Sequence, residues 1–116
     1  MSSHVVSLTR LRQIFNTSGY PQRADSGNNI SVTVVRRGNP APQYNQPPGT
    51  VSETYLYREN RNGRLVVVAK AHAFVLPDGS INNPAGLPDP KYVRIGNDTY
   101  KLARKNPKGR RGKGGK

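Results

Sequence analysis

His72 is the strongest candidate for acid–base chemistry in this sequence, which contains two histidines and six acidic residues. It lies within a long apolar run, whereas His4 is close to the N-terminus. A general base needs a partner within hydrogen-bonding reach. If Glu53 or Arg58 faces His72 across a hairpin, the three would suit RNA cleavage, with a base, an acid and an arginine on the phosphate. Because the sequence does not fix that register, a small ribonuclease or toxin-like enzyme is the alternative hypothesis.

The composition excludes several other kinds of catalytic centre. Cysteine is absent, so the chain has no disulfide, no thiolate nucleophile and no cysteine-ligated zinc. The acidic residues are scattered, and only Asp78 and Asp89 approach each other in predicted loops. The glycine patterns of nucleotide-binding loops and the nucleophile elbow of hydrolases are missing. We therefore predict no metal and no cofactor.

The C-terminal segment carries the most specific functional signal. Residues 101–116 contain eight Lys or Arg and no acid, whereas the first hundred residues have eleven basic against six acidic side chains. A segment with so many charges and so few apolar side chains cannot bury enough apolar surface to offset the conformational entropy that it would lose on folding. We therefore predict a disordered tail over 104–116. Each cation that meets a phosphate releases a counterion and so favours nucleic acid. The predicted contacts in the tail are Arg104, Lys105, Lys108, Arg110, Arg111, Lys113 and Lys116.

The charge of the whole chain indicates the same class of partner. Its formal net charge is +13, from 19 basic and 6 acidic residues. This balance favours a polyanion, with nucleic acid first and an anionic membrane surface next. Phosphate contacts do not distinguish RNA from DNA, and a ribosome or another nucleoprotein is included. We see neither a transmembrane segment nor a secretory signal, which predicts a cytoplasmic or nucleoid- or nucleus-associated protein.

Tyrosines beside basic residues form a second predicted contact. Tyr57 and Tyr92 lie next to cations, and aromatic rings on a sheet surface can stack on unpaired bases. The opposing interpretation is that strand tyrosines pack in the core, which we favour for Tyr55 and Tyr100. The basic neighbours predicted to contact nucleic acid are Arg58, Arg64, Lys91 and Arg94.

The element that positions these side chains is the apolar run GRLVVVAKAHAFVL, residues 63–76, which predicts a long central strand. The Asn62-Gly63 pair before it predicts a hairpin, so the neighbouring strand should run antiparallel. The other predicted strands span residues 30–37, 51–58, 92–95 and 99–102, with a short return strand at Ile81. The last two form a second predicted hairpin about Gly96-Asn97.

Two further segments complete the prediction. Residues 8–16 show apolar side chains at helical spacing and predict one short helix, followed by a polar link over 20–29. The loop 38–49 holds four prolines and is long for a structureless connection, so it is either mobile or functional. Tyr44 in this loop is either an exposed stacking residue or a cover for the sheet edge.

Together these patterns predict a mainly β (α+β) domain over residues 1–103. We expect a small antiparallel sheet or a partly open barrel with one N-terminal helix. The leading functional hypothesis is a non-enzymatic protein that binds nucleic acid through phosphate contacts, largely regardless of sequence. A third hypothesis, besides the ribonuclease, is an adaptor that binds a protein through the proline-rich loop 38–49.

Overall fold

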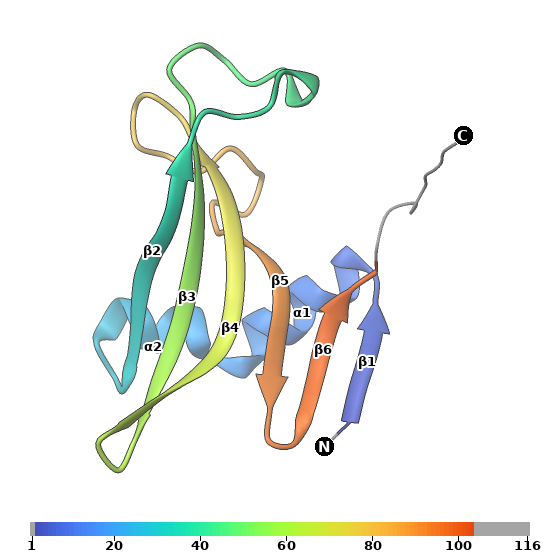
Figure 1. Cartoon of the computed structure of the whole chain (residues 1–116), viewed down its shortest axis with the longest axis vertical. Coiled ribbons are helices and arrows are strands. Elements are labelled where there is room, and N and C mark those ends of the chain that lie inside the picture. The colour runs from blue at the N-terminus through green and yellow to red at the C-terminus, as the bar shows by residue number, and fades with distance from the viewer. Residues whose placement is uncertain (1, 104–116) are drawn as a thin grey trace.

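The computed structural model describes residues 2–103, which form a six-stranded sheet with two helices packed against one of its faces (Figure 1). The sheet order is β1-β6-β5-β4-β3-β2. The strands are β1 (Ser2–Val6), β2 (Ile30–Gly38), β3 (Val51–Arg61), β4 (Arg64–Val75), β5 (Asp89–Ile95) and β6 (Asp98–Leu102). The helices are α1 (Leu8–Ser18) and α2 (Tyr20–Ser26), and a short 3-10 turn, η1, covers Pro42–Tyr44.

The predicted mainly β fold is confirmed, and so are its two hairpins. β3 pairs antiparallel with β4, and β5 pairs antiparallel with β6. Asn62 and Gly63 adopt positive φ angles of 55° and 84° in the first hairpin turn, as that turn type requires. Ile81 forms an isolated antiparallel bridge with Val75, which matches the predicted return strand.

The sheet is mixed and open, so the expected partly open barrel is wrong, and the expected antiparallel sheet holds for β2 to β6 but not for β1. β1 pairs in parallel with β6, an arrangement that needs a long connection such as the one that α1 and the rest of the chain provide. β1 and β2 form the two edges of the sheet and lie far apart (Figure 1). The sheet therefore keeps one face without helices.

The predicted polar link over 20–29 is also wrong in part, because it contains a second helix. Gly19, in a left-handed conformation at φ 81°, ends α1 and at the same time precedes α2. Pro21 lies in the first turn of α2, where its missing N–H has no helical partner to lose. Ser7 caps α1, since its Oγ accepts a hydrogen bond from the backbone N–H of Arg10 at 3.1 Å.

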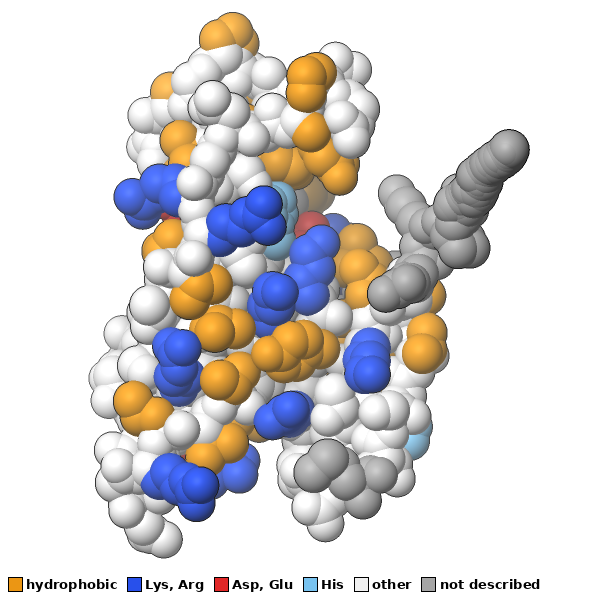
Figure 2. All heavy atoms as spheres, in the orientation of Figure 1, with side chains coloured by type: hydrophobic (Ala, Val, Ile, Leu, Met, Phe, Trp, Pro, Cys, Tyr) orange, Lys and Arg blue, Asp and Glu red, His pale blue; other side chains and the backbone are white. Residues whose placement is uncertain are grey.

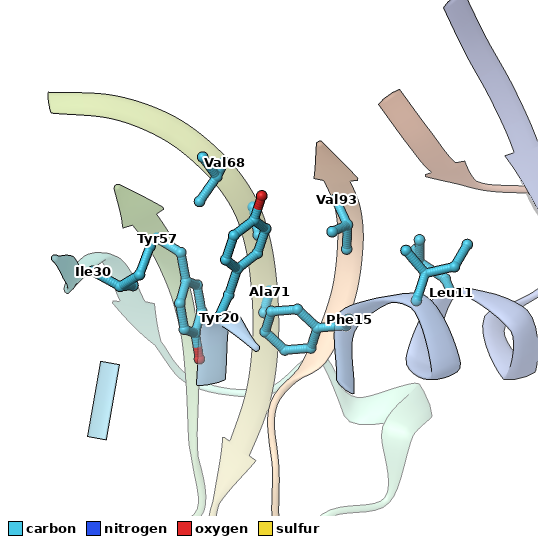
Figure 3. Close-up of a cluster of buried hydrophobic side chains, with 10 residues drawn as sticks. Leu11, Phe15, Tyr20, Ile30, Tyr57, Val68, Ala71 and Val93 are labelled. Atoms are coloured by element: carbon cyan, nitrogen blue, oxygen red, sulfur yellow. The ribbon is translucent and has the colours of Figure 1, made fainter. Parts of the chain in front are cut away.

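The hydrophobic core lies between the helices and the sheet (Figure 3). Phe15 of α1 is 1% exposed and meets the ring of Tyr57 edge-on, with ring centroids 5.2 Å apart. Ala69 and Ala71 of β4 are fully buried, and their small side chains let the helices pack close to the sheet. The remaining buried residues of this cluster are Leu11, Ile14, Tyr20, Ile30, Val68 and Val93.

The remaining features of the fold concern membrane-spanning helices and the C-terminal segment. No helix among residues 2–103 is both long and apolar enough to cross a membrane. The segment 104–116, predicted to be a disordered tail, lies outside the described residues.

Candidate functional site

The face of the sheet opposite the helices, called the open face below, is defined by the strand register. Side chains that pair directly across neighbouring strands share a face. One row crosses all six strands and runs Thr33, Leu56, Lys70, Tyr92, Lys101 and Val5. A second row runs Arg36, Thr54, His72 and Asp89 across four strands. By contrast, the row through Tyr57, Ala69 and Val93 faces the helices.

Several basic side chains lie on the face shown in Figure 2. Arg58 continues the alternation of Leu56 on β3, and Arg94 continues that of Tyr92 on β5. Lys91 is the extra residue of a bulge in β5 and lines a groove on this face beside His72. The six cations of the open face are Arg36, Arg58, Lys70, Lys91, Arg94 and Lys101.

Acidic side chains are almost absent from this face. Asp89 is its single carboxylate, and Arg12 of α1 holds both Asp89 oxygens, at 2.8 and 3.0 Å. Tyr57 faces the helices, and strand alternation puts Glu53, four residues before it, and Glu59, two residues after it, on the same side of β3. The other three acids are Asp25 in α2, Asp78 in the turn after β4, and Asp98, which bonds to His4.

The carboxylates off the open face neutralise cations off the open face. Glu53 pairs with Arg37 at 2.6 Å, while Glu59 pairs with both Arg23 and Arg61 at 2.8 Å. The hydrogen bond from the Tyr55 hydroxyl is the main cause of the lowered pKa of Glu53, and the pairing with Arg37 lowers that pKa further. The hydrogen bond from Arg61 is the main cause of the lowered pKa of Glu59, and the pairing with Arg23 adds to it. Within residues 2–103, none of the six open-face cations has a carboxylate within 4.0 Å. The open face therefore carries unneutralised positive charge.

A groove of about 1170 Å³ crosses the open face near the end of β4. The loop after β2 forms one wall, and the start of β5 forms the other. Its floor comes from β3 and β4, through Ser52, Thr54, His72 and Phe74. Arg36, Arg37 and Lys91 are the cations that line it.

His72 lies in this groove, but the trio predicted around it is not assembled. Its cross-strand neighbours are Thr54 and Asp89, and its Nε2 shares a hydrogen bond of 2.7 Å with the Oγ of Ser52. Glu53 points to the opposite face because it is adjacent to Thr54 on the strand, and Arg58 pairs with Val67 instead. Burial lowers the pKa of His72, and the charge of Lys91 lowers it further, against the raising effect of Asp89. Neither Glu53 nor Arg58 faces His72, so the condition under which the three would form a base–acid–arginine site is not met.

The two tyrosines predicted to stack on bases have different environments. Tyr57 is 4% exposed within the core, where burial raises its pKa to about 12, so the prediction that it stacks on a base is wrong. Tyr92 lies on the open face between Lys70 and Lys101, in direct register with both. Of the two rings, only Tyr92 can meet a ligand on this face.

Three of the four basic residues predicted on the sheet lie on the open face: Arg58, Lys91 and Arg94. Arg64 pairs with Arg61 at the tip of the β3–β4 hairpin, and strand alternation puts both on the helix side. Sequence reasoning missed Arg36, Lys70 and Lys101. Lys70 had a usable signal, because it shares period-two spacing with His72 on β4. The seven predicted contacts from Arg104 to Lys116 lie outside the described residues.

The metal-binding potential of the described residues and the similarity of the chain to known proteins also bear on the site. Residues 2–103 contain no cluster of three or more His, Asp or Glu side chains that could hold a metal ion. Searches of protein-family models, curated proteins and solved structures found no match to the chain. The functional inference therefore rests on the geometry and charge of the open face.

Proposed function

We propose that this chain binds nucleic acid, with the open face as its principal contact surface and the basic C-terminal segment adding further phosphate contacts. The observation that carries the proposal is the set of six open-face cations without carboxylate partners among residues 2–103. Uncompensated positive charge on one face attracts a polyanion and steers its approach.

The six cations are spread across neighbouring strands, which suits an extended phosphate backbone better than a single small anion. They come from five neighbouring strands, β2 to β6. Lys and Arg neutralise phosphates whatever the base sequence, so the contacts set affinity and position more than specificity. We therefore expect binding that is strongly salt-dependent and only weakly sequence-dependent.

Two double variants with equal charge test the proposal. Lys70→Ala/Arg94→Ala removes two open-face cations, whereas Arg10→Ala/Arg64→Ala removes two cations from α1 and the hairpin tip. On duplex DNA, the first variant should lower the slope of log affinity against log salt by about 1.8, at about 0.9 per contact. The second should leave the slope close to that of the unaltered chain. Equal losses in the two variants would reject the open face as the contact surface.

The ribonuclease hypothesis makes a different prediction that the same material can check. His72 is hydrogen-bonded to Ser52, and the only carboxylate in its row is already held by Arg12. On the binding proposal, RNA incubated with the full chain stays intact. Fragmentation that is lost in His72→Ala would instead establish the enzyme.

The adaptor hypothesis concerns the loop 38–49. Exchanging this loop for a short Gly-Ser link should preserve the salt dependence of DNA binding, because the loop contains no Lys or Arg. Capture of a protein partner that needs the loop, together with no affinity for nucleic acid, would favour the adaptor.

A further inference from the structure

The groove on the open face contains three aromatic rings in contact. Phe74 of β4 is the central one, with its centroid 4.7 Å from the imidazole of His72 and 5.3 Å from the ring of Tyr44. His72 meets Phe74 edge-on at 85°, and Tyr44 is tilted at 48°. Tyr44 remains 54% exposed despite this contact. One side of the cluster is therefore available to a flat ligand.

The proline-rich loop positions Tyr44 over the groove. The 3-10 turn Pro42–Tyr44 is closed by hydrogen bonds from the backbone N–H groups of Tyr44 and Asn45 to the carbonyls of Ala41 and Pro42. Gln46 then ties the loop to the turn after β4 by accepting a hydrogen bond from the amide of Asn82 at 2.7 Å. An exposed aromatic ring anchored on both sides is suited to stacking.

Cations flank the aromatic cluster. Arg36 lies on β2 at the shift in its register with β3, and Lys91 lies at the bulge in β5. Both line the groove, and neither has a carboxylate within 4.0 Å in the described part of the chain. Bulges often redirect a side chain at the edge of a site. The groove thus combines an aromatic surface with positive charge on two sides.

We propose that this groove holds an unpaired base of a single-stranded nucleic acid, stacked on Tyr44 and Phe74, with Arg36 and Lys91 on the flanking phosphates. This inference rests on the proposed function and adds a preference for single strands. A base inside a duplex is already stacked on both sides, so only an unpaired base can enter the groove. Stacking accepts any base because every base has a π-face, which suits a protein with little sequence preference.

The decisive comparison is between oligothymidylate and an abasic strand, which have equal charge and differ only in their bases; the duplex adds a ligand whose bases are all paired. The full chain is titrated with oligothymidylate of about ten nucleotides, and with an abasic strand and a duplex of the same length. Oligothymidylate should bind about tenfold tighter than the abasic strand, as expected for stacking of a base on an aromatic ring. Oligouridylate and oligodeoxyuridylate, which differ only in the 2′-hydroxyl, separate RNA from DNA: tighter binding of oligouridylate would assign the groove to RNA, and weaker binding to DNA.

Variants connect that difference to the groove. Phe74→Leu and Tyr44→Ala should each reduce the preference for oligothymidylate over the abasic strand to about threefold or less. Tyr44 is largely exposed, so its variant keeps the test valid if Phe74→Leu fails to fold. Arg36→Ala should weaken both ligands by the same factor. As a matched aromatic control, Tyr100→Leu on the helix side should leave the preference unchanged.

The outcomes separate the two proposals. Equal affinity for oligothymidylate and the abasic strand would overturn the base site and leave phosphate binding intact. A preference that survives both Tyr44→Ala and Phe74→Leu would also overturn it. No binding to any of the strands would overturn the proposed function itself, and the base site with it.

Discussion

The pKa of His72 reports on the charge in the groove, because it depends on the groups that surround the imidazole. Burial lowers that pKa, and the nearby ammonium of Lys91 lowers it further. We predict that Lys91→Ala raises the pKa of His72, since a like charge is removed. Binding of a nucleic acid in the groove should raise it as well, because phosphates favour the imidazolium.

Proton NMR of the histidine ring over a pH series measures both effects. His4, which stacks on Tyr100 on the other face, provides an internal reference whose ring signals should not respond to the ligand. A His72 titration that is the same with and without nucleic acid would place the ligand away from the groove.

The limits of sequence reasoning at this scale come from bulges. Strict alternation puts Val67 and Ala69 on one face, yet Val67 pairs with Arg58 on the open face and Ala69 with Tyr57 in the core. The register shift between them makes Val68 an extra residue. Beyond such a point, period-two reasoning assigns every side chain to the wrong face. Tyr57 and the partners of His72 were mispredicted because the sequence gives no local signal for strand pairing.

Among the helices and strands, α2 is joined to β3 of the sheet by an ion pair of Glu59. Its carboxylate pairs with Arg23 of α2 and with Arg61 of its own strand, and the hydrogen bond from Arg61 is the main cause of its lowered pKa. A carboxyl group with a lowered pKa in the folded state stabilises the fold above its unfolded pKa. That contribution is lost as the pH falls through the lower, folded pKa.

We predict that Glu59→Gln lowers stability at neutral pH by about 1 kcal/mol, because the ion pairs are partly exposed. The melting temperature should fall by about 4–8 °C. Between neutral pH and acid below the ordinary carboxyl pKa, the variant should also lose less stability than the unaltered chain. Thermal denaturation at several pH values, followed by circular dichroism, measures both. Asp25→Asn, in α2 but without an ion pair among residues 2–103, is the control, and equal acid sensitivity in Glu59→Gln would contradict the prediction.

The elements themselves were predicted unevenly. Five strands and both hairpins followed from apolar runs and from turn pairs such as Asn62-Gly63 and Gly96-Asn97. β1 was missed because Ser2–Val6 is short and largely exposed, and its only partner, β6, is almost a hundred residues away. The polar composition of Tyr20–Ser26 hid α2, which is held by Pro21 in its first turn and by burial of Tyr20. Tertiary contacts, rather than local propensity, decide both elements.

In the molecule as a whole, the two faces of the sheet differ in packing and in charge. The helix side holds the core and the ion pairs of Glu53 and Glu59, while the open face holds cations without such partners among residues 2–103. The total charge of +13 was evident from composition. The placement of six cations without carboxylate partners on one face of residues 2–103 was not evident, because it depends on register.

Deleting residues 104–116 tests the contribution of the basic segment. The deletion removes seven positive charges, and no large apolar side chain is lost with them. If about half of these charges contact phosphates, the salt slope on duplex DNA should fall by roughly three, at about 0.9 per contact. Binding should remain, because the open face is still present. An unchanged slope would limit the interface to residues 2–103, and unfolding would show that the segment packs on the domain.

The most direct test of the central claim is a map of where the nucleic acid lies, from methyl NMR of the full chain titrated with an oligonucleotide. Leu56 and Val67 report on the open face, while Ile14 and Val32 report on the side of the helices. If nucleic acid binds on the open face, the Leu56 and Val67 methyl signals should show saturable shifts that salt weakens, and those of Ile14 and Val32 should not change. Shifts confined to Ile14 and Val32 would contradict this claim, as would the absence of any saturable shift.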